Sequence, residues 1–178
     1  YEKFDEYVNV FVEMRRKKGM TEARARELLL TNPLYFGCMM VKQDDADGMV
    51  AGAINASADV LRAALQTLKT APGTRIVSAF FLVIVPDCEY GSNGAFVFSD
   101  AGLNQSPSAS ELADIAEQSA KSFQLLVQDE PVVAMLSHST KGSAKHPDVD
   151  KVIEATEIVN AEFPDLRCDG ELQSDAAL

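Results

Sequence analysis

Apolar residues recur at helical spacing along the first part of the chain, and this pattern predicts three successive helices. The first covers residues 2–18 and ends at Gly19. The second follows an N-cap at Thr21 and runs to about Leu30, before Asn32 and Pro33. Pro33 lies in the first turn of the third helix. That helix carries side chains typical of a protein core: Tyr35, Phe36, Met39 and Met40.

The pattern then changes, because a short apolar run, Met49 to Ala53, predicts a strand. A small polar loop follows, and Ser57 to Thr70 predicts a helix that carries Arg62. The next residues, 70–74, are rich in Pro and Gly, which break regular structure. We therefore predict a domain boundary here, with residues 1–72 in a first α/β domain and residues 73–178 in a second.

Beyond the boundary, strand and helix patterns alternate. Residues 76–85 form a continuous apolar run, typical of a buried strand, and a second strand is expected within 94–100. Ser108 and Glu111 have the spacing of a capping box and predict a helix start. A buried strand at 132–136, a helix at about 148–162 and a last strand that begins within residues 166–169 complete the pattern. This order predicts a three-layer αβα fold.

Charge and composition narrow the function classes. The 178 residues carry a net charge of −11, which disfavours nucleic acid and anionic membranes as partners. No signal-peptide pattern opens the chain and no apolar run is long enough to span a membrane, so we expect a cytoplasmic protein. Three widely spaced cysteines indicate reduced thiols rather than disulfides, and no Cys/His spacing suggests a metal site.

Against this acidic background, residues 15–18 form a run of four cations. Their ordinary role is to offset the dipole at a helix C-terminus, and their alternative role is to bind a multiply charged phosphate ligand. Arg62 is a second candidate, placed near a helix start where Ser57 serves as cap and hydroxyl donor. An inward-facing Arg62 would bind an oxyanion there, whereas the simpler alternative is an ion pair with Asp59.

A hydroxyl-rich loop, residues 137–143, follows the strand at 132–136. Strand-end loops are where open α/β sheets bind ligands, so Ser139 and Thr140 are candidate substrate-binding residues. The loop lacks the spacing of a P-loop. Its residues alone favour a hydrogen-bonded turn over a binding site.

Several segments together resemble the phosphate acetyl/butyryl-transferase family. The resemblance extends over essentially the whole chain, in matching order and spacing. It rests on these motifs: Glu13-Met14-Arg15 with Lys18-Gly19, Ser57-x-Asp59-x-Leu61-Arg62, Val85-Pro86-Asp87-Cys88-Glu89-Tyr90-Gly91-Ser92, Ala134-Met135-Leu136-Ser137 with Ser139-Thr140-Lys141-Gly142-Ser143, and Asp169-Gly170-Glu171-Leu172-Gln173. The resemblance implies a two-domain architecture like that of isocitrate and isopropylmalate dehydrogenases, of which this chain would be an internal fragment.

The resemblance also implies an activity, the reversible transfer of an acetyl group between acetyl phosphate and coenzyme A through a ternary complex. Arg62 would be the catalytic arginine that binds substrate phosphate, and Arg15 would contact a coenzyme A phosphate. Inorganic phosphate and acetyl-CoA would be the other reactants, with no metal, no cofactor beyond coenzyme A as substrate, and a homodimer as the assembly. In family members a Ser-Arg pair and an aspartate base lie in a C-terminal part that these 178 residues lack, so this chain alone is expected to be inactive.

Three alternatives stay open at this point. The acyl group could be butyryl or propionyl instead of acetyl. The chain could be a non-catalytic ligand-binding or assembly fragment of such an enzyme. An NAD-dependent decarboxylating dehydrogenase is the third alternative, because the family resembles those enzymes in fold, although the sequence carries no nicotinamide or metal signature.

Overall fold

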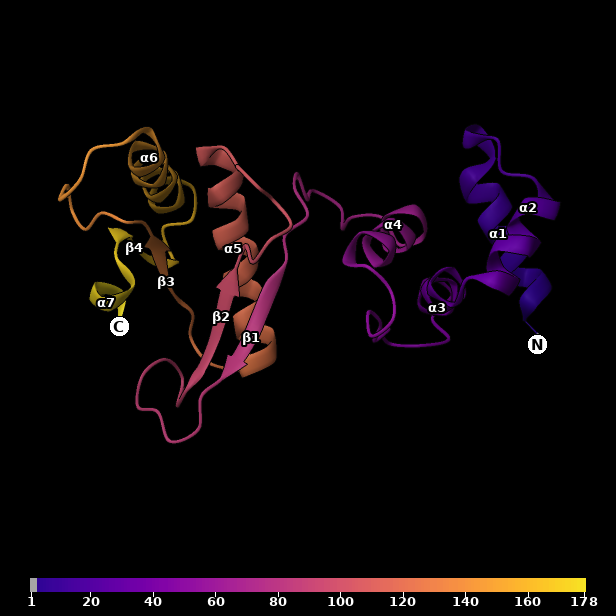
Figure 1. Ribbon diagram of the computed structural model, residues 1–178, viewed down its shortest axis with the longest axis horizontal. Helices are drawn as coiled ribbons and strands as arrows, with labels where there is room; N and C mark the ends of the chain where they lie inside the picture. Colours follow the sequence, from indigo (N-terminus) through magenta and orange to yellow (C-terminus); the bar gives the residue numbers. More distant parts are fainter. Residues whose placement is uncertain (1–2) are drawn as a thin grey trace. The chain divides into compact units, whose positions relative to one another are not determined.

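The computed structural model describes residues 3–178, which divide into two compact units on either side of the Pro72–Gly73 bond (Figure 1). The elements of the first unit are all helical: α1 (Phe4–Arg15), the 3-10 turn η1 (Arg16–Lys18), α2 (Glu22–Thr31), α3 (Pro33–Lys42) and α4 (Ser57–Thr67). The predicted first helix is confirmed as α1 with η1, although its residue 2 lies outside the described residues.

Local sequence signals explain where these helices begin and end. Gly19 ends the first helical segment in the left-handed conformation, with φ of 76°, which a glycine adopts at little cost. The Thr21 hydroxyl accepts from the backbone N–H of Arg24 at 3.3 Å, so the predicted N-cap is confirmed. Asn32 caps α3 by accepting from the N–H of Leu34 at 3.0 Å, and Pro33 occupies the first helical position.

The first unit has its own apolar core, to which all four α-helices contribute. Tyr35 lies close to Phe11, with ring centroids 5.8 Å apart, which joins α3 to α1. The buried members of this core are Tyr7, Val8, Phe11, Ala25, Leu29, Leu34, Tyr35, Cys38, Met39 and Ala63. The sequence interpretation of Tyr35 and Met39 as core residues is therefore confirmed.

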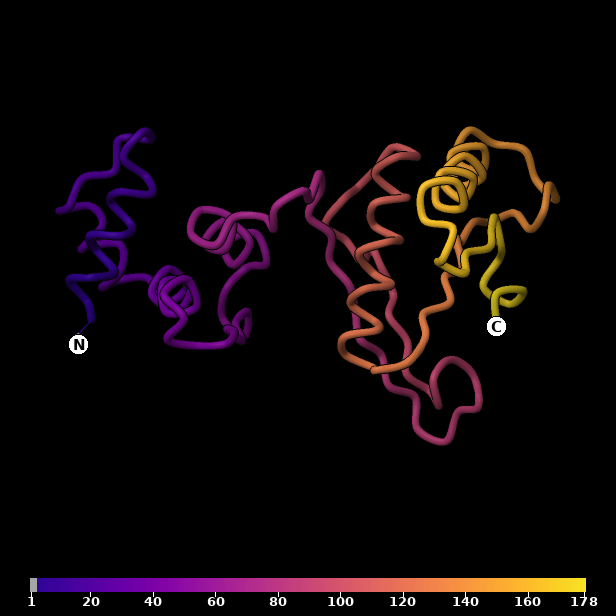
Figure 2. The backbone as a smooth tube through the Cα atoms, turned by 180° about the vertical axis from the view of Figure 1, so that it is seen from behind, coloured from indigo at the N-terminus to yellow at the C-terminus, as the bar shows by residue number. Residues whose placement is uncertain are grey.

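The strand predicted at Met49 to Ala53 is wrong. This stretch lies in an irregular loop between α3 and α4 (Figure 2), and the Val50 and Ile54 side chains are almost fully exposed. The first unit contains no strand among the described residues, so an extended segment here finds no partner for its backbone N–H and C=O groups. A short apolar run alone therefore does not show whether a segment forms a strand, because the strand also needs a pairing partner.

The expected cap of α4 is also wrong. Ala56 is the N-cap residue and makes no side-chain cap bond, while Ser57 is the first helical residue. A serine side chain caps a helix only from the flanking, non-helical position. Ser57 lies one residue beyond that position, so its hydroxyl does not accept a hydrogen bond from the first free backbone N–H groups of α4. The helix also ends at Thr67 rather than Thr70, and Lys69 has a φ of 66°.

The second unit combines helices and strands. Its elements are β1 (Phe80–Ile84), β2 (Ala95–Ser99), α5 (Ala109–Val127), β3 (Val132–Leu136), α6 (Pro147–Glu162), β4 (Arg167–Leu172) and α7 (Ser174–Ala177). Their order confirms an α/β composition. Among residues 3–178, no helix is both long and apolar enough to cross a bilayer.

The strands pair in two separate sheets. β1 and β2 form an antiparallel hairpin that lies against α5, whereas β3 and β4 pair in parallel and contact α6 (Figure 1). The buried residues between α5, α6 and the β3–β4 pair form the core of this unit. Since the described strands do not join in one sheet, the three-layer arrangement stays a prediction.

The apolar run at 76–85 is a shorter and more exposed strand than predicted. Only residues 80–84 pair with β2, and the Phe81 and Ile84 side chains are each 62% exposed. At Val77, a side chain takes the place of a strand partner, because the Asn104 amide donates to the Val77 carbonyl at 2.9 Å. An apolar run thus predicted a strand correctly but not its burial.

The predicted capping box at the start of α5 is present. The backbone N–H of Ser108 donates to the Glu111 carboxylate at 2.8 Å, and the Ser108 hydroxyl accepts from the Glu111 N–H at 3.4 Å. Two free amides of the helix N-terminus are satisfied in this way. The Ser108 N–H, together with the Ser108 hydroxyl that donates to the same carboxylate at 2.9 Å, holds the pKa of Glu111 below its usual value.

Replacing Ser108 by alanine should lower the free energy of unfolding of the second unit by about 0.5–2 kcal/mol. The alanine removes the acceptor for the Glu111 amide, whereas Ser108→Asn retains a capping oxygen and serves as the matched control. Urea denaturation of the whole protein measures both changes. Equal stability of the alanine and asparagine variants would show that the capping bond contributes nothing.

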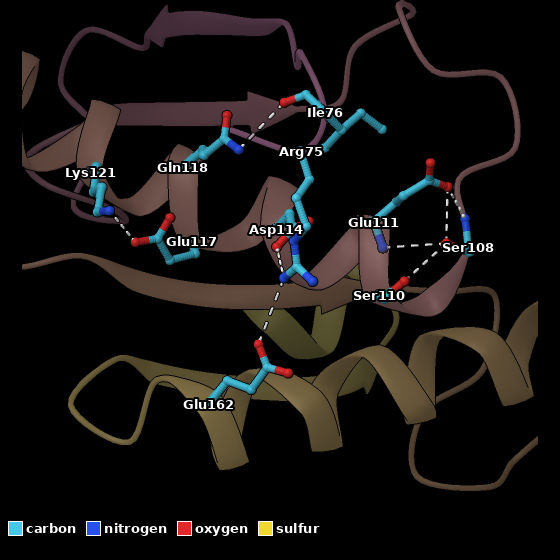
Figure 3. A network of polar contacts seen from close by, with 10 residues as sticks. All are labelled: Arg75, Ile76, Ser108, Ser110, Glu111, Asp114, Glu117, Gln118, Lys121 and Glu162. Carbon is cyan, nitrogen blue, oxygen red and sulfur yellow. Dashed lines mark hydrogen bonds and ion pairs between the residues drawn. The ribbon is translucent and has the colours of Figure 1, made fainter. Parts of the chain in front are cut away.

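Figure 3 shows how the first residues of the second unit are attached to α5 and α6. The Arg75 guanidinium lies 2.6 Å from the Asp114 carboxylate on α5 and 3.8 Å from Glu162 on α6. The Gln118 amide donates to the Ile76 carbonyl at 3.4 Å. Arg75 is therefore engaged by structural partners, unlike several cations of the first unit.

Candidate functional site

A cavity of about 400 Å³ lies in the first unit, and residues from its four α-helices and from η1 line it. Arg15 comes from the C-terminal end of α1 and Lys18 from η1, whereas Arg24 lies on α2 and Arg62 on α4. The turn at Gly19 reverses the chain between α1 and α2, so that cations from both helices reach the same cavity. The structure thus brings together Arg15 and Arg62, the two candidate arginines.

Three of the four cations that line this cavity have no ion-pair partner among the described residues. Among residues 3–178, Arg15, Lys18 and Arg24 have no carboxylate within ion-pair distance. Arg26, in contrast, contacts Asp5 at 2.7 Å and Glu22 at 3.0 Å. A concentration of unneutralised cations in a chain of net charge −11 is suited to an anionic ligand.

Arg15 also carries an unsatisfied donor. Among the described residues, its Nε is the buried side-chain polar atom that has no hydrogen-bond partner. Leaving such a group unpaired costs about 1–3 kcal/mol, and more if it is charged. An oxyanion in the cavity would supply the missing acceptor, because a guanidinium binds carboxylates and phosphates through two parallel N–H groups.

Arg62 is more exposed than the sequence interpretation of an inward-facing arginine suggested. Its side chain is 57% exposed, and its Nη1 lies 2.5 Å from the Asp59 carboxylate, three residues earlier on α4. The ion pair that the sequence allowed is therefore present, and it coexists with the position of Arg62 at the cavity wall. The exposed Ser57 is not among the residues that line the cavity.

Sequence reasoning missed five polar residues of the cavity: Arg24, Glu27, Thr31, Tyr35 and Gln66. Tyr35 is buried, as its core assignment requires, yet its hydroxyl donates to the Gln66 side-chain oxygen at 3.1 Å. Gln66 follows Arg62 by four residues, which places both on one face of α4. That spacing was a signal in the sequence, but only the position of α3 shows that the face borders a cavity.

The hydroxyl-rich loop after β3 is held together from within. Ser139 is fully buried, and its hydroxyl donates to the Glu171 carboxylate at 3.0 Å and accepts from the Ala144 amide at 3.0 Å. Glu171 also accepts from the Gly142 amide at 2.7 Å. These bonds, the Gly142 amide first, lower the pKa of Glu171 although burial opposes the shift.

Thr140 is equally engaged, because its hydroxyl accepts from the Gln173 amide at 2.9 Å and donates to the Gln173 side-chain oxygen at 3.2 Å. A separate cavity of about 310 Å³ in the second unit is lined by Ser137 and His138 of the same loop, but not by Ser139 or Thr140. The hydrogen-bonded turn favoured by the residues alone is therefore what the structure shows.

Two of the three cysteines, Cys38 and Cys168, are disfavoured as thiolates by burial. Cys38 is fully buried, and burial raises its pKa despite a hydrogen bond with Thr67. Burial and the nearby Asp169 raise the pKa of Cys168 to about 11. Within residues 3–178, no group of three or more His, Cys, Asp or Glu side chains is placed to bind a metal ion.

Comparison with known proteins agrees with the sequence resemblance. The family described as phosphate acetyl/butaryl transferase matches residues 1–178. The chain is 58% identical to a phosphate acetyltransferase of Thermoanaerobacterium thermosaccharolyticum over 177 residues, which are 99% of this chain and 54% of the relative. A phosphate acetyltransferase of Acetivibrio thermocellus is 54% identical, again over 99% of this chain and 53% of the relative. The chain thus spans about half the length of these relatives.

Solved structures give the same result. A phosphotransacetylase from Streptococcus pyogenes superposes with a TM-score of 0.84 at 46% identity, over 100% of this chain and 52% of the other. The EutD phosphotransacetylase from Staphylococcus aureus superposes with a TM-score of 0.83 at 42% identity, with the same coverage. The match over all 178 residues and these identities show that the chain belongs to the phosphate acetyl/butaryl transferase family.

Proposed function

We propose that this chain is part of a phosphate acetyltransferase, which transfers an acetyl group reversibly between acetyl phosphate and coenzyme A. The observation that carries the proposal is the cavity in which Arg15 and Arg62 meet, with an unpaired donor on Arg15. Both substrates carry phosphate groups, and the cavity offers cations without carboxylate partners. Membership in the family makes acyl transfer the reaction that such a phosphate site serves.

The proposed reaction proceeds in a ternary complex without an acyl-enzyme. The coenzyme A thiol loses its proton to a carboxylate base, which the family resemblance places outside these 178 residues. The thiolate sulfur then attacks the acetyl carbonyl, and a carbon–sulfur bond forms. As the bond to phosphate breaks, inorganic phosphate leaves with the electron pair. Alignment of two bound reactants can supply about 7–11 kcal/mol toward the barrier.

In this reaction the arginines bind and orient phosphate. Arg62 would hold the substrate phosphate and stabilise its growing charge as the carbon–oxygen bond breaks, which makes it the proposed catalytic arginine. Arg15 would bind a coenzyme A phosphate through its Nε and Nη groups. Metal ions have no role in the proposed chemistry, and coenzyme A is a substrate rather than a resident cofactor.

Several finer features remain proposals. They include the dehydrogenase-like three-layer architecture, a homodimer and a cytoplasmic location. Ser57, Ser139 and Thr140 stay candidate substrate-binding residues. For Ser139 and Thr140 a ligand would have to replace existing hydrogen bonds, so we expect alanine there to affect stability more than substrate affinity.

The direct test is an assay of acetyl-CoA formation from acetyl phosphate and coenzyme A by the full-length protein of which this chain is proposed to be part. Calorimetry with coenzyme A, run in parallel, measures binding alone. Turnover with acetyl phosphate supports the proposal. Binding of coenzyme A without turnover would instead indicate a ligand-binding or assembly role, and a faster reaction with butyryl or propionyl phosphate would identify the related acyltransferase. Reduction of NAD would indicate a dehydrogenase.

Asp59 offers a second test of the phosphate site. Because its carboxylate is paired with Arg62, Asp59→Asn should free the guanidinium and strengthen phosphate binding. Exposed ion pairs contribute at most about 1 kcal/mol, so the expected gain in affinity is up to about fivefold. Calorimetry with inorganic phosphate measures it. Glu22→Gln, which alters the Arg26 pair outside the cavity, is the control; weaker binding by Asp59→Asn would mean that Asp59 positions Arg62 for the ligand.

A further inference from the structure

We propose that Gln66 is a further substrate-binding residue of this cavity, whose side-chain NH2 group donates to a dianionic phosphate beside Arg62. Tyr35 is the positioning residue that orients this amide. The inference rests on the proposed function, because it assigns a role within the same phosphate site. The sequence analysis assigned no binding role to Gln66 and only a core position to Tyr35.

The orientation of the amide is the first step of the argument. The Tyr35 hydroxyl donates to the Gln66 side-chain oxygen at 3.1 Å. The oxygen and the NH2 group of an amide point in different directions, so an oxygen turned toward Tyr35 turns the NH2 group away from it. Within residues 3–178, no protein group accepts from this NH2 group, and Gln66 lines the cavity. The amide therefore offers its two N–H donors to a ligand.

The rigidity of this pair supports the assignment. Tyr35 is 7% exposed and packs in the core of the first unit, with its ring against Phe11. Its hydroxyl is consequently held in one place, at the boundary between core and cavity. A donor whose orientation is set by a buried partner loses less conformational entropy on ligand binding than a freely rotating side chain.

The balance of donors and acceptors indicates which ligand the site prefers. The cationic groups of the cavity are all donors, and Tyr35 removes the Gln66 oxygen from the set of free acceptors. The Thr31 hydroxyl donates to the Glu27 main-chain carbonyl, and the Glu27 carboxylate is the acidic group of the described lining. The four cations of the lining outnumber this one carboxylate, so the cavity wall has a net positive charge. The cavity therefore favours the fully ionised, dianionic form of a phosphate over the singly charged form.

Two substrates could supply the dianionic phosphate group: coenzyme A, through its terminal phosphate monoester, and acetyl phosphate. The N–H donors of the cavity would bind the phosphate oxygens of either substrate in the same way. Binding of coenzyme A, dephospho-coenzyme A and acetyl phosphate by the same variants separates them. If a variant weakens coenzyme A but not dephospho-coenzyme A, Gln66 contacts the terminal monoester, whereas a loss confined to acetyl phosphate assigns the reacting phosphate.

The first experiment replaces Gln66 in the whole protein. Gln66→Leu removes a donor from an ionised phosphate, so it should weaken binding of one of these ligands by about 10- to 100-fold. Gln66→Glu has nearly the same shape but replaces the donor with a negative acceptor, so it should weaken binding more. Calorimetry measures each dissociation constant, and circular dichroism and the melting temperature confirm that the variants are folded.

The pH dependence of phosphate binding is a further measurement, and substitution of Gln66 would not alter it if Gln66 only stabilised the fold. The charged groups that face Gln66 are the four cations of the cavity, the Glu27 carboxylate and the Asp59 carboxylate paired with Arg62. None is a histidine or cysteine. The second pKa of a phosphate monoester is about 6, so wild-type affinity for a monoester should rise with pH through this value as the dianion forms. Gln66→Glu should flatten that rise.

Tyr35→Phe tests the positioning role. Removal of the hydroxyl should weaken phosphate binding about 2- to 5-fold in the wild-type background. In a Gln66→Leu background it should have no further effect on binding, because there is no amide left to orient. A loss of affinity that persists in that background would show that the hydroxyl acts on the fold instead, and would overturn the role given to Tyr35.

Failure of this inference is distinct from failure of the proposed function. If the wild-type protein forms acetyl-CoA while Gln66→Leu and Gln66→Glu bind all three ligands normally, the assignment of Gln66 is wrong and acyl transfer stands. If the wild-type protein neither binds coenzyme A nor transfers acetyl groups, the proposed function is wrong, and the role of Gln66 that rests on it is overturned with it.

Discussion

Replacing Arg62 by alanine is expected to lower kcat/KM for coenzyme A and acetyl phosphate about 10- to 100-fold. A hydrogen bond to a charged group contributes about 1.5–3 kcal/mol, and the alanine removes such a bond from the phosphate. Steady-state kinetics on the whole protein measures the change. A fall in kcat would show that Arg62 acts in the transition state, whereas a rise in KM alone would show that it only binds substrate.

Two further variants test whether the loss of activity depends on the cavity or on positive charge in general. Arg15→Ala should give a loss of the same order, because the cavity brings both guanidiniums together. Arg16→Ala is the matched control, since Arg16 is a neighbouring cation whose side chain is 76% exposed and does not line the cavity. Equal losses for Arg15→Ala and Arg16→Ala would indicate a general effect of positive charge and would contradict a built phosphate site.

Replacing Glu171 by glutamine is expected to lower the melting temperature of the second unit by roughly 5 °C at pH 7. The carboxylate accepts from the Gly142 amide and from the Ser139 hydroxyl inside the loop, and glutamine retains the shape but not the charge. The charge matters because bonds to an ionised acceptor are about twice as strong as neutral ones.

The effect of this substitution should depend on pH. The pKa of Glu171 is lowered in the folded protein, chiefly by the Gly142 amide, so ionisation stabilises the fold above the unfolded value of about 4.3. That contribution is lost as pH falls from the unfolded pKa through the folded pKa, and the two proteins should converge in stability once the Glu171 carboxylate is protonated in both states. Thermal unfolding between pH 7 and 3 tests this. Glu157→Gln, an exposed carboxylate on α6, is the control, and a constant difference at all pH values would contradict the role of ionisation.

Local signals predicted most elements well, because their causes are local. The caps at Thr21 and Ser108 and the start of α3 at Pro33 depend on residues within one helical turn, so they could be read from the sequence. β3, at Val132–Leu136, was also predicted with its exact bounds. The strand at residues 49–53 failed because a strand needs a partner, and partners are not encoded locally.

The site was predicted less completely than the fold. Arg15 and Arg62 were identified from their motifs, but nothing local indicates that Arg24, Tyr35 and Gln66 share a cavity with them. Ser139 illustrates the opposite error, since a hydroxyl-rich loop suggests ligand binding while the structure shows a buried hydroxyl bonded to Glu171. Its partner lies far along the chain, beyond the reach of a pattern.

The sequence by itself determined the family, through the resemblance of its motifs, and most of the succession of helices and strands, through periodicity and capping residues. The resemblance also identified the two arginines proposed to bind phosphate. Only the tertiary structure decided which side chains surround the cavity, which cations lack a carboxylate partner, and that Tyr35 occupies the Gln66 oxygen. The physical reason is that burial, pairing and donor orientation depend on contacts between α1, α2, α3 and α4, which form only when these helices pack together.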